Sequence, residues 1–346
     1  SENVAQRPEV EAHASSKSIS CTGKVFCFGF NHRRISFVKK FFPVMDFVFV
    51  STQAKAGDLI KVKNDLLSQK NTTSVWVWGT KVPDIVKPLL KNKDINFFYF
   101  EDGFFCANSS DVNGDMVPFS LSIDSQANHY ENGKTTDIEN ILNYSQFFND
   151  DLLLNRSRQL RAKMISNNLG KGIFYCVASD KALAEDVKDY ILVVGQPETK
   201  TSLKNSNENF ELLKLASKEN PGGRVLYKPF DANIVSFSND INKYIYDNKI
   251  NVINDDNSLY LLFDRIKHVY VVKSLVGLDA LVRGIPVTTT GCPFYAGWGL
   301  TDDRIGKISR RSRKLTLDEL IAGTYILYLK YFDPVTGESI SPEMAI

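Results

Sequence analysis

Residues 268–303 read HVYVVKSLVGLDALVRGIPVTTTGCPFYAGWGLTDD. The run 268–272 is apolar and β-branched, which is typical of a strand buried on both faces of a parallel sheet. Ser274 then fits the N-cap of a helix over 275–283, which a glycine and a proline end. A second buried strand is predicted over 285–290. This order of strand, helix and strand with tight connections predicts an α/β fold with a parallel sheet.

Ligands of such units lie at the carboxyl ends of the strands, beside the helix N-terminus. Ser274 and the N–H groups after it are therefore a candidate phosphate cradle. Asp279 is the single acid inside the predicted helix. In the string that follows, PFYAGWGLTDD, two glycines flank Trp298. We expect this loop to turn tightly and to present exposed aromatic side chains as a ligand wall.

The run SLVGLDALVRGIPV followed by GCPFYAGWGLTDD resembles the signature of the bacterial capsular polysaccharide β-Kdo transferases. In that family a glutamate is common where this chain has Asp279. The resemblance implies a two-domain GT-B glycosyltransferase built from two Rossmann-like α/β domains, with this stretch in the half that binds the nucleotide sugar. From the strand and helix pattern alone, an ordinary βαβ unit of any doubly wound protein remains the alternative.

Bulk composition limits the classes of function. The 346 residues favour two domains, and 42 basic against 40 acidic residues argue against a nucleic-acid partner. Five irregularly spaced cysteines predict neither a disulfide framework nor a zinc site and favour a cytoplasmic setting. No apolar run reaches the ~18 residues of a spanning helix and no signal peptide is evident, so we expect action on lipid-linked material from the inner-membrane surface, as a peripheral protein. Basic residues within 307–314 either meet anionic headgroups or a phosphorylated glycan, or form a solvated loop.

The N-terminal half alternates predicted strands and helices, which indicates a mainly parallel sheet. The predicted strands are 24–30, 47–51, 74–78 and 95–100, and the predicted helices are 35–42, 56–69 and 82–91. In the second half we expect strands at 190–195, 225–228 and 250–253 and helices at 150–166, 207–218 and 258–265. The chain starts without Met, so it is expected to be part of a longer polypeptide. The expected divisions are a tail over 1–20, an acceptor-side domain over 21–170, a nucleotide-sugar domain over 171–314, and a closing helix and tail over 315–346 that the resemblance implies cross back to the first domain.

Glu101 and Asp102 directly follow the predicted strand 95–100. Burying an unpaired carboxylate costs several kcal/mol, so a catalytic acid or base explains them better than stability does; a helix cap or a loop salt bridge is the alternative. The resemblance supports catalysis, because EDGF here and PFSLSID further on match family motifs, although the family's Leu, Arg and Ser after EDGF are replaced by FCA. Arg33 and Arg34, at the end of the first strand, are candidate acceptor-binding cations.

Two motifs depart from the family. The resemblance implies a nucleophilic aspartate where this chain has Thr199 and Lys200, and a donor-side histidine where it has Phe230. Neither threonine nor lysine can form the equivalent covalent intermediate. Glu198 is the one acid left in that motif and is the candidate for a displaced nucleophile.

The sequence therefore predicts an enzyme, a glycosyltransferase that moves a sugar, with Kdo from CMP-Kdo and retention implied by the resemblance, onto a capsule, O-antigen or lipid-linked glycan. No cofactor or obligatory metal is expected, since an Asp-x-Asp motif is absent. Two alternatives stay open: a non-catalytic nucleotide-sugar or glycan-binding module, and a transferase for another activated sugar. The candidate donor-binding residues are Gln196, Lys228, Ser274, Leu275, Asp279, Tyr295, Gly297, Trp298 and Gly299.

Overall fold

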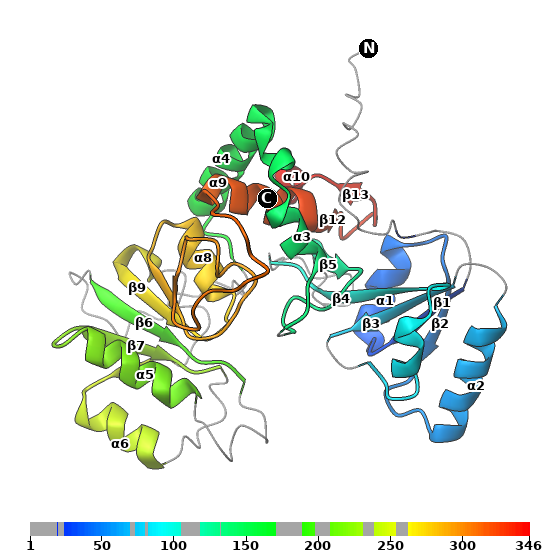
Figure 1. Ribbon diagram of the computed structural model, residues 1–346, viewed down its shortest axis with the longest axis horizontal. Coiled ribbons are helices and arrows are strands. Elements are labelled where there is room, and N and C mark those ends of the chain that lie inside the picture. Colours follow the sequence, from blue (N-terminus) through cyan, green and yellow to red (C-terminus); the bar gives the residue numbers. More distant parts are fainter. Residues whose placement is uncertain are drawn as a thin grey trace. The chain divides into compact units, whose positions relative to one another are not determined.

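The protein forms two compact α/β units, shown in the computed structural model of Figure 1. One unit comprises Ser1–Phe104, Ser109–Ser157 and Ala322–Ile346, and the other comprises Phe105–Asn108 and Arg158–Ile321. The structure describes residues 19, 24–69, 73–79, 82–104, 118–131, 133–170, 189–197, 208–230, 239–253 and 262–346. Each unit is described below by itself.

The first unit is built on a seven-stranded sheet in the order β13-β12-β5-β4-β3-β1-β2. Its β1 to β4 run parallel, and β5, β12 and β13 continue the sheet in antiparallel pairs. The strands are β1 (Lys24–Phe28), β2 (Asp46–Val50), β3 (Thr73–Trp78), β4 (Ile95–Asp102), β5 (Ser120–Asp124), β12 (Lys330–Phe332) and β13 (Ser339–Ile340).

Hydrophobic side chains cover both faces of this sheet. Alternate residues of a strand point to opposite faces, and β3 follows this rule: its tryptophans, Trp76 and Trp78, pack with helix α1 (His32–Phe41). Its valines pack instead with Leu66 of helix α2 (Ala56–Ser68). One helix on each face of a parallel sheet is the doubly wound arrangement that the sequence predicted.

The further helices described in this unit are short. They are η2 (Lys87–Lys91), α3 (Asp137–Asn143), η3 (Ser145–Asn149), the π-helix η6 (Ala322–Tyr328) and α10 (Pro342–Ala345). Thr136 caps α3, since its hydroxyl accepts a hydrogen bond from the N–H of Glu139 at 3.3 Å. The predicted helix over 82–91 is wrong in its extent, since only a 3₁₀ turn forms at its end.

The second unit has a six-stranded parallel sheet in the order β11-β10-β9-β6-β7-β8. Its strands are β6 (Tyr190–Val194), β7 (Arg224–Lys228), β8 (Asn251–Val252), β9 (Ile266–Val271), β10 (Val287–Thr289) and β11 (Asp302–Asp303). Its helices are α5 (Glu208–Glu219), α6 (Asn239–Asp247), η5 (Phe263–Arg265), α8 (Val276–Val282) and α9 (Leu317–Ile321). Gly284 has φ +75° directly after α8, as a helix-ending glycine requires.

Two continuous helical segments cross the division between the units. Helix α4 (Asp151–Ser166) contains the division at Ser157 and Arg158, whereas the sequence placed a boundary after residue 170. At the other crossing α9 runs directly into η6, and the chain then enters β12, which pairs with β5 of the first unit. The last 25 residues, 322–346, therefore complete the sheet of the first unit.

Candidate functional site

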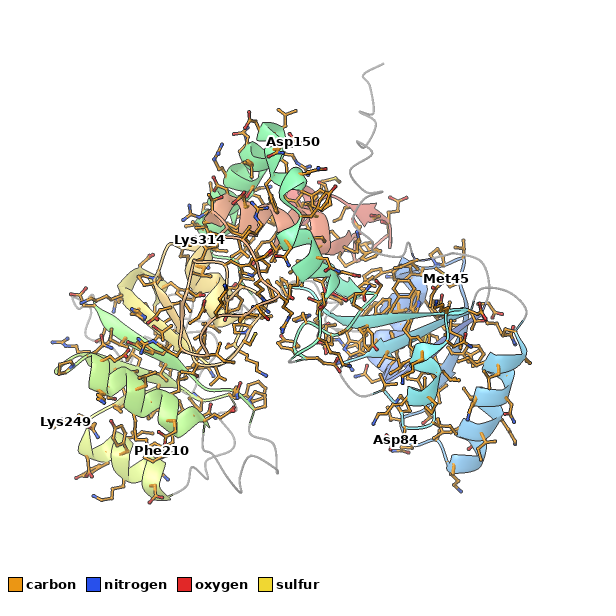
Figure 2. The ribbon with its side chains drawn as sticks, viewed as in Figure 1. Met45, Asp84, Asp150, Phe210, Lys249 and Lys314 are labelled. Carbon is orange, nitrogen blue, oxygen red and sulfur yellow. The ribbon has the colours of Figure 1, made fainter. Side chains whose placement is uncertain are left out.

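The carboxyl ends of β1 to β4 enclose a pocket of about 830 Å³ in the first unit. Gly29 and Gly79 form its turns, with φ of +81° and +82°, a conformation that other residues adopt only with strain. A Cβ on Gly29 would lie 2.8 Å from the carbonyl oxygen of Trp78. The lining also includes Asp84, which Figure 2 labels. Ligands of parallel sheets bind at this edge, so the pocket is the candidate ligand site of this unit.

Arg34 supplies the pocket with a positive charge. Its guanidinium carbon lies 4.4 Å from the centroid of the Trp78 ring, and Nη1 donates to the carbonyl of Gly29 at 3.3 Å. Burial lowers the pKa of Arg34, while the negative charges of Asp102 and Glu101 act in the opposite direction. The cation is therefore held against an aromatic face within the field of two carboxylates. Its sequence neighbour Arg33, the other predicted acceptor-binding residue, is exposed.

Glu101 and Asp102 are the last two residues of β4 rather than a loop after it. They pair with Ser122 and Leu121 of β5, respectively. Because successive side chains of a strand point to opposite faces, the two carboxylates face different sides of the sheet. The described lining of the pocket includes Glu101 and not Asp102. Of the two predicted acids, the structure thus favours Glu101 as the one that meets a ligand in the pocket.

A buried polar network lies behind the pocket, and the sequence analysis missed it. Tyr328 of η6 donates to Asp124 Oδ2 at 3.1 Å and lies 3.4 Å from the hydroxyl of Ser122. The same Ser122 hydroxyl is 3.2 Å from Nδ1 of His129. Burial, followed by the negative charge of Asp137, raises the pKa of Asp124 to about 7. The motif PFSLSID carried a signal for this network, because its serine and aspartate alternate with apolar residues, but their partner in η6 is some 200 residues away in the chain.

In the second unit, Ser274 stands where a strand turns into a helix, as predicted. Its Oγ accepts the N–H of Val276 at 3.2 Å, and its carbonyl accepts the N–H of Gly277 at 3.1 Å. Helix α8 begins one residue later than predicted, at Val276, with Leu275 in the cap position. Leu275 and Asp279, two further predicted donor-binding residues, are buried, with side chains 6% and 1% exposed. A phosphate cradle at Ser274 stays a prediction.

The expectation of an exposed aromatic wall is wrong for Tyr295 and Trp298, because both side chains are fully buried. The Tyr295 hydroxyl donates to the carbonyl of Ser274, and Trp298 Nε1 donates to the carbonyl of Phe294 at 2.7 Å. These aromatic residues therefore shape the loop from within, and Tyr295 ties it directly to the turn before α8.

The glycines of this loop do turn tightly, as predicted. Gly297 and Gly299 have φ of +82° and +81°. The N–H of Gly297 donates to Asp303 Oδ2 at 2.9 Å, and a Cβ on Gly299 would meet the side chain of Lys314, which Figure 2 labels. Asp303, in the short strand β11, thus has a structural role in holding this loop.

The remaining donor-side predictions lie near the ends of β6 and β7. The Gln196 N–H donates to Asn209 Oδ1 at 2.9 Å, and its side-chain amide donates to Glu208. Lys228 is buried, and its Nζ donates to the carbonyl of Pro229 at 2.9 Å. Phe230, which replaces the family's histidine, is 61% exposed. The candidate nucleophile Glu198, together with Thr199 and Lys200, lies outside the described residues.

The basic residues within 307–314 are largely used inside the second unit. Arg311 is buried, and its Nη1 donates to the carbonyls of Pro293 and Ala296. Arg313 pairs with Glu319 at 2.8 Å. Arg310 Nη2 donates to Cys292 Sγ at 3.9 Å. All three arginines of this stretch therefore have partners inside the second unit.

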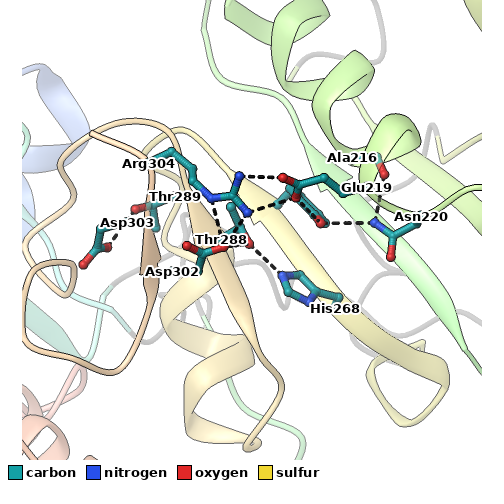
Figure 3. A network of polar contacts seen from close by, with 10 residues as sticks. Ala216, Glu219, Asn220, His268, Thr288, Thr289, Asp302, Asp303 and Arg304 are labelled. Atoms are coloured by element: carbon teal, nitrogen blue, oxygen red, sulfur yellow. Dashed lines mark hydrogen bonds and ion pairs between the residues drawn. The ribbon is translucent and has the colours of Figure 1, made fainter. Parts of the chain in front are cut away.

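A second polar cluster lies at the edge of this sheet, shown in Figure 3. Arg304 bridges the carboxylates of Asp302 and Glu219. Its hydrogen bonds lower the pKa of both acids. On β9, which β10 separates from β11, burial lowers the pKa of His268, whose Nε2 lies 2.8 Å from Thr288 Oγ1 of β10. All these contacts join strand edges and the end of α5, so the cluster fastens β11 to the sheet.

Within the described ranges, no group of three or more His, Cys, Asp or Glu side chains is placed to hold a metal ion. Among the same residues, no helix is long and apolar enough to cross a membrane.

Comparison with known proteins shows which proteins the chain resembles. The sequence profile of the capsule polysaccharide biosynthesis proteins matches residues 176–331. The lipopolysaccharide-processing protein LpsZ of Rhizobium meliloti is 31% identical over 277 residues, which are 78% of this chain and 62% of LpsZ. These matches confirm the resemblance to the capsule polysaccharide family that the sequence predicted.

A second relative resembles the chain along nearly its whole length. The capsule polysaccharide modification protein LipA of Neisseria meningitidis serogroup A is 29% identical over 348 residues, covering 95% of this chain and 46% of LipA. The chain thus spans about half to two thirds of the length of these relatives.

Two solved structures share the fold of this chain. The Thermosulfurimonas dismutans KpsC structure described as a beta Kdo 2,7 transferase is 28% identical, has a TM-score of 0.66, and covers 93% of this chain and 97% of that one. The KpsC beta Kdo 2,4 transferase structure of the same organism is 22% identical, has a TM-score of 0.68, and covers 92% of this chain and 97% of that one. At this identity the likeness shows a shared fold alone. The predicted class of two Rossmann-like α/β domains of GT-B type is confirmed.

Proposed function

We propose that this chain is a glycosyltransferase that moves Kdo from CMP-Kdo, with retention, onto a glycan acceptor of a capsule, O-antigen or lipid-linked polysaccharide. The observation that carries the proposal is the likeness to the KpsC beta Kdo 2,7 transferase, which spans both α/β units of this chain. A cytoplasmic location at the inner-membrane surface belongs to the same proposal, since lipid-linked acceptors are reached there.

The acceptor is proposed to bind in the pocket of the first unit. Arg34 gives that pocket a fixed cation, and Glu101 gives it a carboxylate in the wall. Glu101 acts as the acid or base on the incoming hydroxyl, a role that contributes roughly 10²- to 10⁴-fold to the rate. The donor is proposed to bind the second unit near Ser274, with Glu198 as the displaced nucleophile. The reaction is proposed to need no metal.

A panel of nucleotides and their sugars tests the donor assignment. We expect CMP and CMP-Kdo to raise the melting temperature and UDP or GDP to leave it unchanged, because a ligand that binds the folded state stabilises it by mass action. Stabilisation by UDP or GDP without CMP would assign a different activated sugar. Transfer that persists in EDTA supports metal independence, and loss of transfer that Mg²⁺ or Mn²⁺ restores refutes it.

The second candidate is a non-catalytic module that binds a nucleotide sugar or glycan. Thr199 and Lys200 in place of the family's two aspartates, and an exposed Phe230 in place of its histidine, favour this candidate. Hydrolysis of the donor separates the two, because even a slow transferase releases sugar to water while a binding module leaves the donor intact.

A further inference from the structure

Asn128 occupies a fixed position in the loop between β5 and α3. Its side chain is 1% exposed, and its Oδ1 accepts the N–H of Tyr130 at 3.0 Å. Its carbonyl accepts the N–H of Glu131 at 2.9 Å, so the residue starts a tight turn that its own side chain closes. Because the side-chain oxygen is committed to a backbone donor, the NH₂ group must face the opposite direction. There, Nδ2 lies 3.5 Å from Oε1 of Glu101.

The loop that carries Asn128 is anchored on both sides of that residue. Before it, Asp124 Oδ1 accepts the N–H groups of Gln126 and Ala127 at 2.9 and 3.1 Å. After it, the His129 ring packs at 5.2 Å against that of Phe104, directly beyond the end of β4. These contacts hold the amide of Asn128 in place independently of its contact with Glu101.

On its other side, Glu101 Oε1 approaches the turn after β3. A Cβ on Gly79 would lie 3.6 Å from this oxygen, and the N–H of Gly79 donates to the carbonyl of Phe100 at 3.0 Å. The oxygen therefore lies between a glycine turn and the Asn128 amide. We propose that Asn128 is a positioning residue, which fixes Oε1 of Glu101 in the wall of the pocket. Its part in the reaction rests on the proposed function, in which Glu101 is the acid or base.

The contact also has an electrostatic consequence. A donor to a carboxylate favours the charged form, so its removal raises the pKa of that carboxyl. Charged groups near Glu101 include Arg34 from α1 and Asp102 from β4 itself. Asp84 and Lys87 line the same pocket, and His129 and Glu131 lie on the same loop as Asn128. All of these are unchanged in a variant at position 128, so a shift in such a variant reports the loss of the amide.

The test is an NMR titration of the Glu101 carboxyl in the full chain, assigned by its absence in Glu101→Gln. Asn128→Asp keeps the side-chain volume and an oxygen for the Tyr130 N–H, but it replaces the donor with a carboxylate. We expect it to raise the pKa of Glu101 by about one unit or more, and Asn128→Ala to raise it by about half a unit. Gln126→Glu makes the same chemical change at an exposed position two residues earlier in the loop. It should leave the pKa of Glu101 within ~0.3 unit of its wild-type value. Should Asn128→Ala not fold, Asn128→Asp carries the test.

Kinetics on the same variants separate this inference from the proposed function. For a positioning residue we expect kcat of transfer to fall about tenfold with KM for the acceptor little changed, and the acid limb of the pH profile to move upward with the titration. An unshifted Glu101 in Asn128→Asp, or an unchanged kcat, overturns the positioning role. A shifted Glu101 in a chain whose wild type transfers no sugar supports the contact and refutes the transferase assignment instead.

Discussion

The hydroxyl of Tyr328 donates to the carboxylate of Asp124 at 3.1 Å and joins residues that are 204 positions apart in the chain. It ties the returning π-helix to the end of β5, beside the pairing of β12 with β5. The first unit thus depends on the last segment of the chain for part of its buried polar network. Because Tyr328 is 2% exposed, water cannot replace this bond.

Tyr328→Phe removes the hydroxyl and leaves the ring. We expect it to lower the free energy of unfolding by about 1–3 kcal/mol, because a buried carboxylate loses a donor. Urea denaturation measures this change. Tyr144→Phe, which removes an exposed hydroxyl bonded to Gln146, is the matched control. It should change the free energy of unfolding by less than ~0.5 kcal/mol. Equal effects of the two substitutions would show that the Asp124 contact adds nothing.

The stability of the protein should fall as pH rises from about 4 to 7 through the contribution of Asp124. Its pKa is 3.8 when unperturbed and about 7 in the folded state. Between these values the folded state holds a proton that the unfolded state has lost, so its advantage is full below pH ~4 and is lost above pH ~7.

The wild type minus Asp124→Asn difference in unfolding free energy isolates this effect. Taking this difference cancels the contribution of His268, which is common to both proteins and has the opposite pH dependence. The pKa of His268 is lowered in the folded state, so its contribution to stability is lost as pH falls below 6.5. We expect the difference to decline steadily between pH 4 and 7. A difference that is flat or rises with pH would mean that Asp124 is ionised throughout this range.

Gly277→Ala should destabilise the second unit. A Cβ there would collide with the Tyr295 hydroxyl and lie 3.1 Å from Cγ2 of Val271. We expect a loss of about 1–3 kcal/mol, as for other overpacked sites. Tyr295→Phe removes the obstructing oxygen. The double variant Gly277→Ala/Tyr295→Phe should therefore lose less unfolding free energy than the sum of the losses in the two single variants.

Gly57→Ala in α2 is the matched control for that substitution. No atom lies within 4 Å of the added Cβ, so only the helix preference of alanine acts. We expect a gain of up to about 1 kcal/mol. A gain at both glycines would show that Tyr295 does not pack closely on α8.

Ser274→Ala should weaken the stabilisation by CMP while leaving the fold intact. The proposal assigns this hydroxyl to the donor phosphate, and in the structure it accepts the N–H of Val276 at 3.2 Å. We expect the CMP-induced rise in melting temperature to shrink to less than half. The same rise in wild type and variant would place the nucleotide elsewhere.

The outcome for β4 shows what a local pattern can predict. Its apolar run over 95–100 predicted the strand, but the strand continues through Glu101 and Asp102 because both pair with β5. That pairing depends on residues about 20 positions away, and β5 itself is stabilised by β12 from the end of the chain. The sequence therefore predicted the parallel strands and their acids, and it could not predict which acid faces the pocket.

The loop around Trp298 shows why the aromatic wall was predicted wrongly. Glycines beside aromatic residues indicated a turn at a ligand site, and the turn is present. Its tryptophan is buried because Arg311 packs at 5.7 Å from the ring and Ile308 lies against Gly297. Both come from the following loop, whose charges predicted an exposed surface. Burial by such a segment is a tertiary effect that the order of residues alone does not reveal.

The central claim is that Glu101 performs acid or base chemistry on an acceptor. The most direct measurement is the initial rate of sugar transfer from CMP-Kdo to a glycan acceptor by wild type, Glu101→Gln and Asp102→Asn, with CMP affinity measured in parallel. We predict that Glu101→Gln lowers kcat by roughly 10²- to 10⁴-fold at unchanged CMP affinity, and that Asp102→Asn lowers it less than tenfold. Transfer by Glu101→Gln at the wild-type rate would contradict the account.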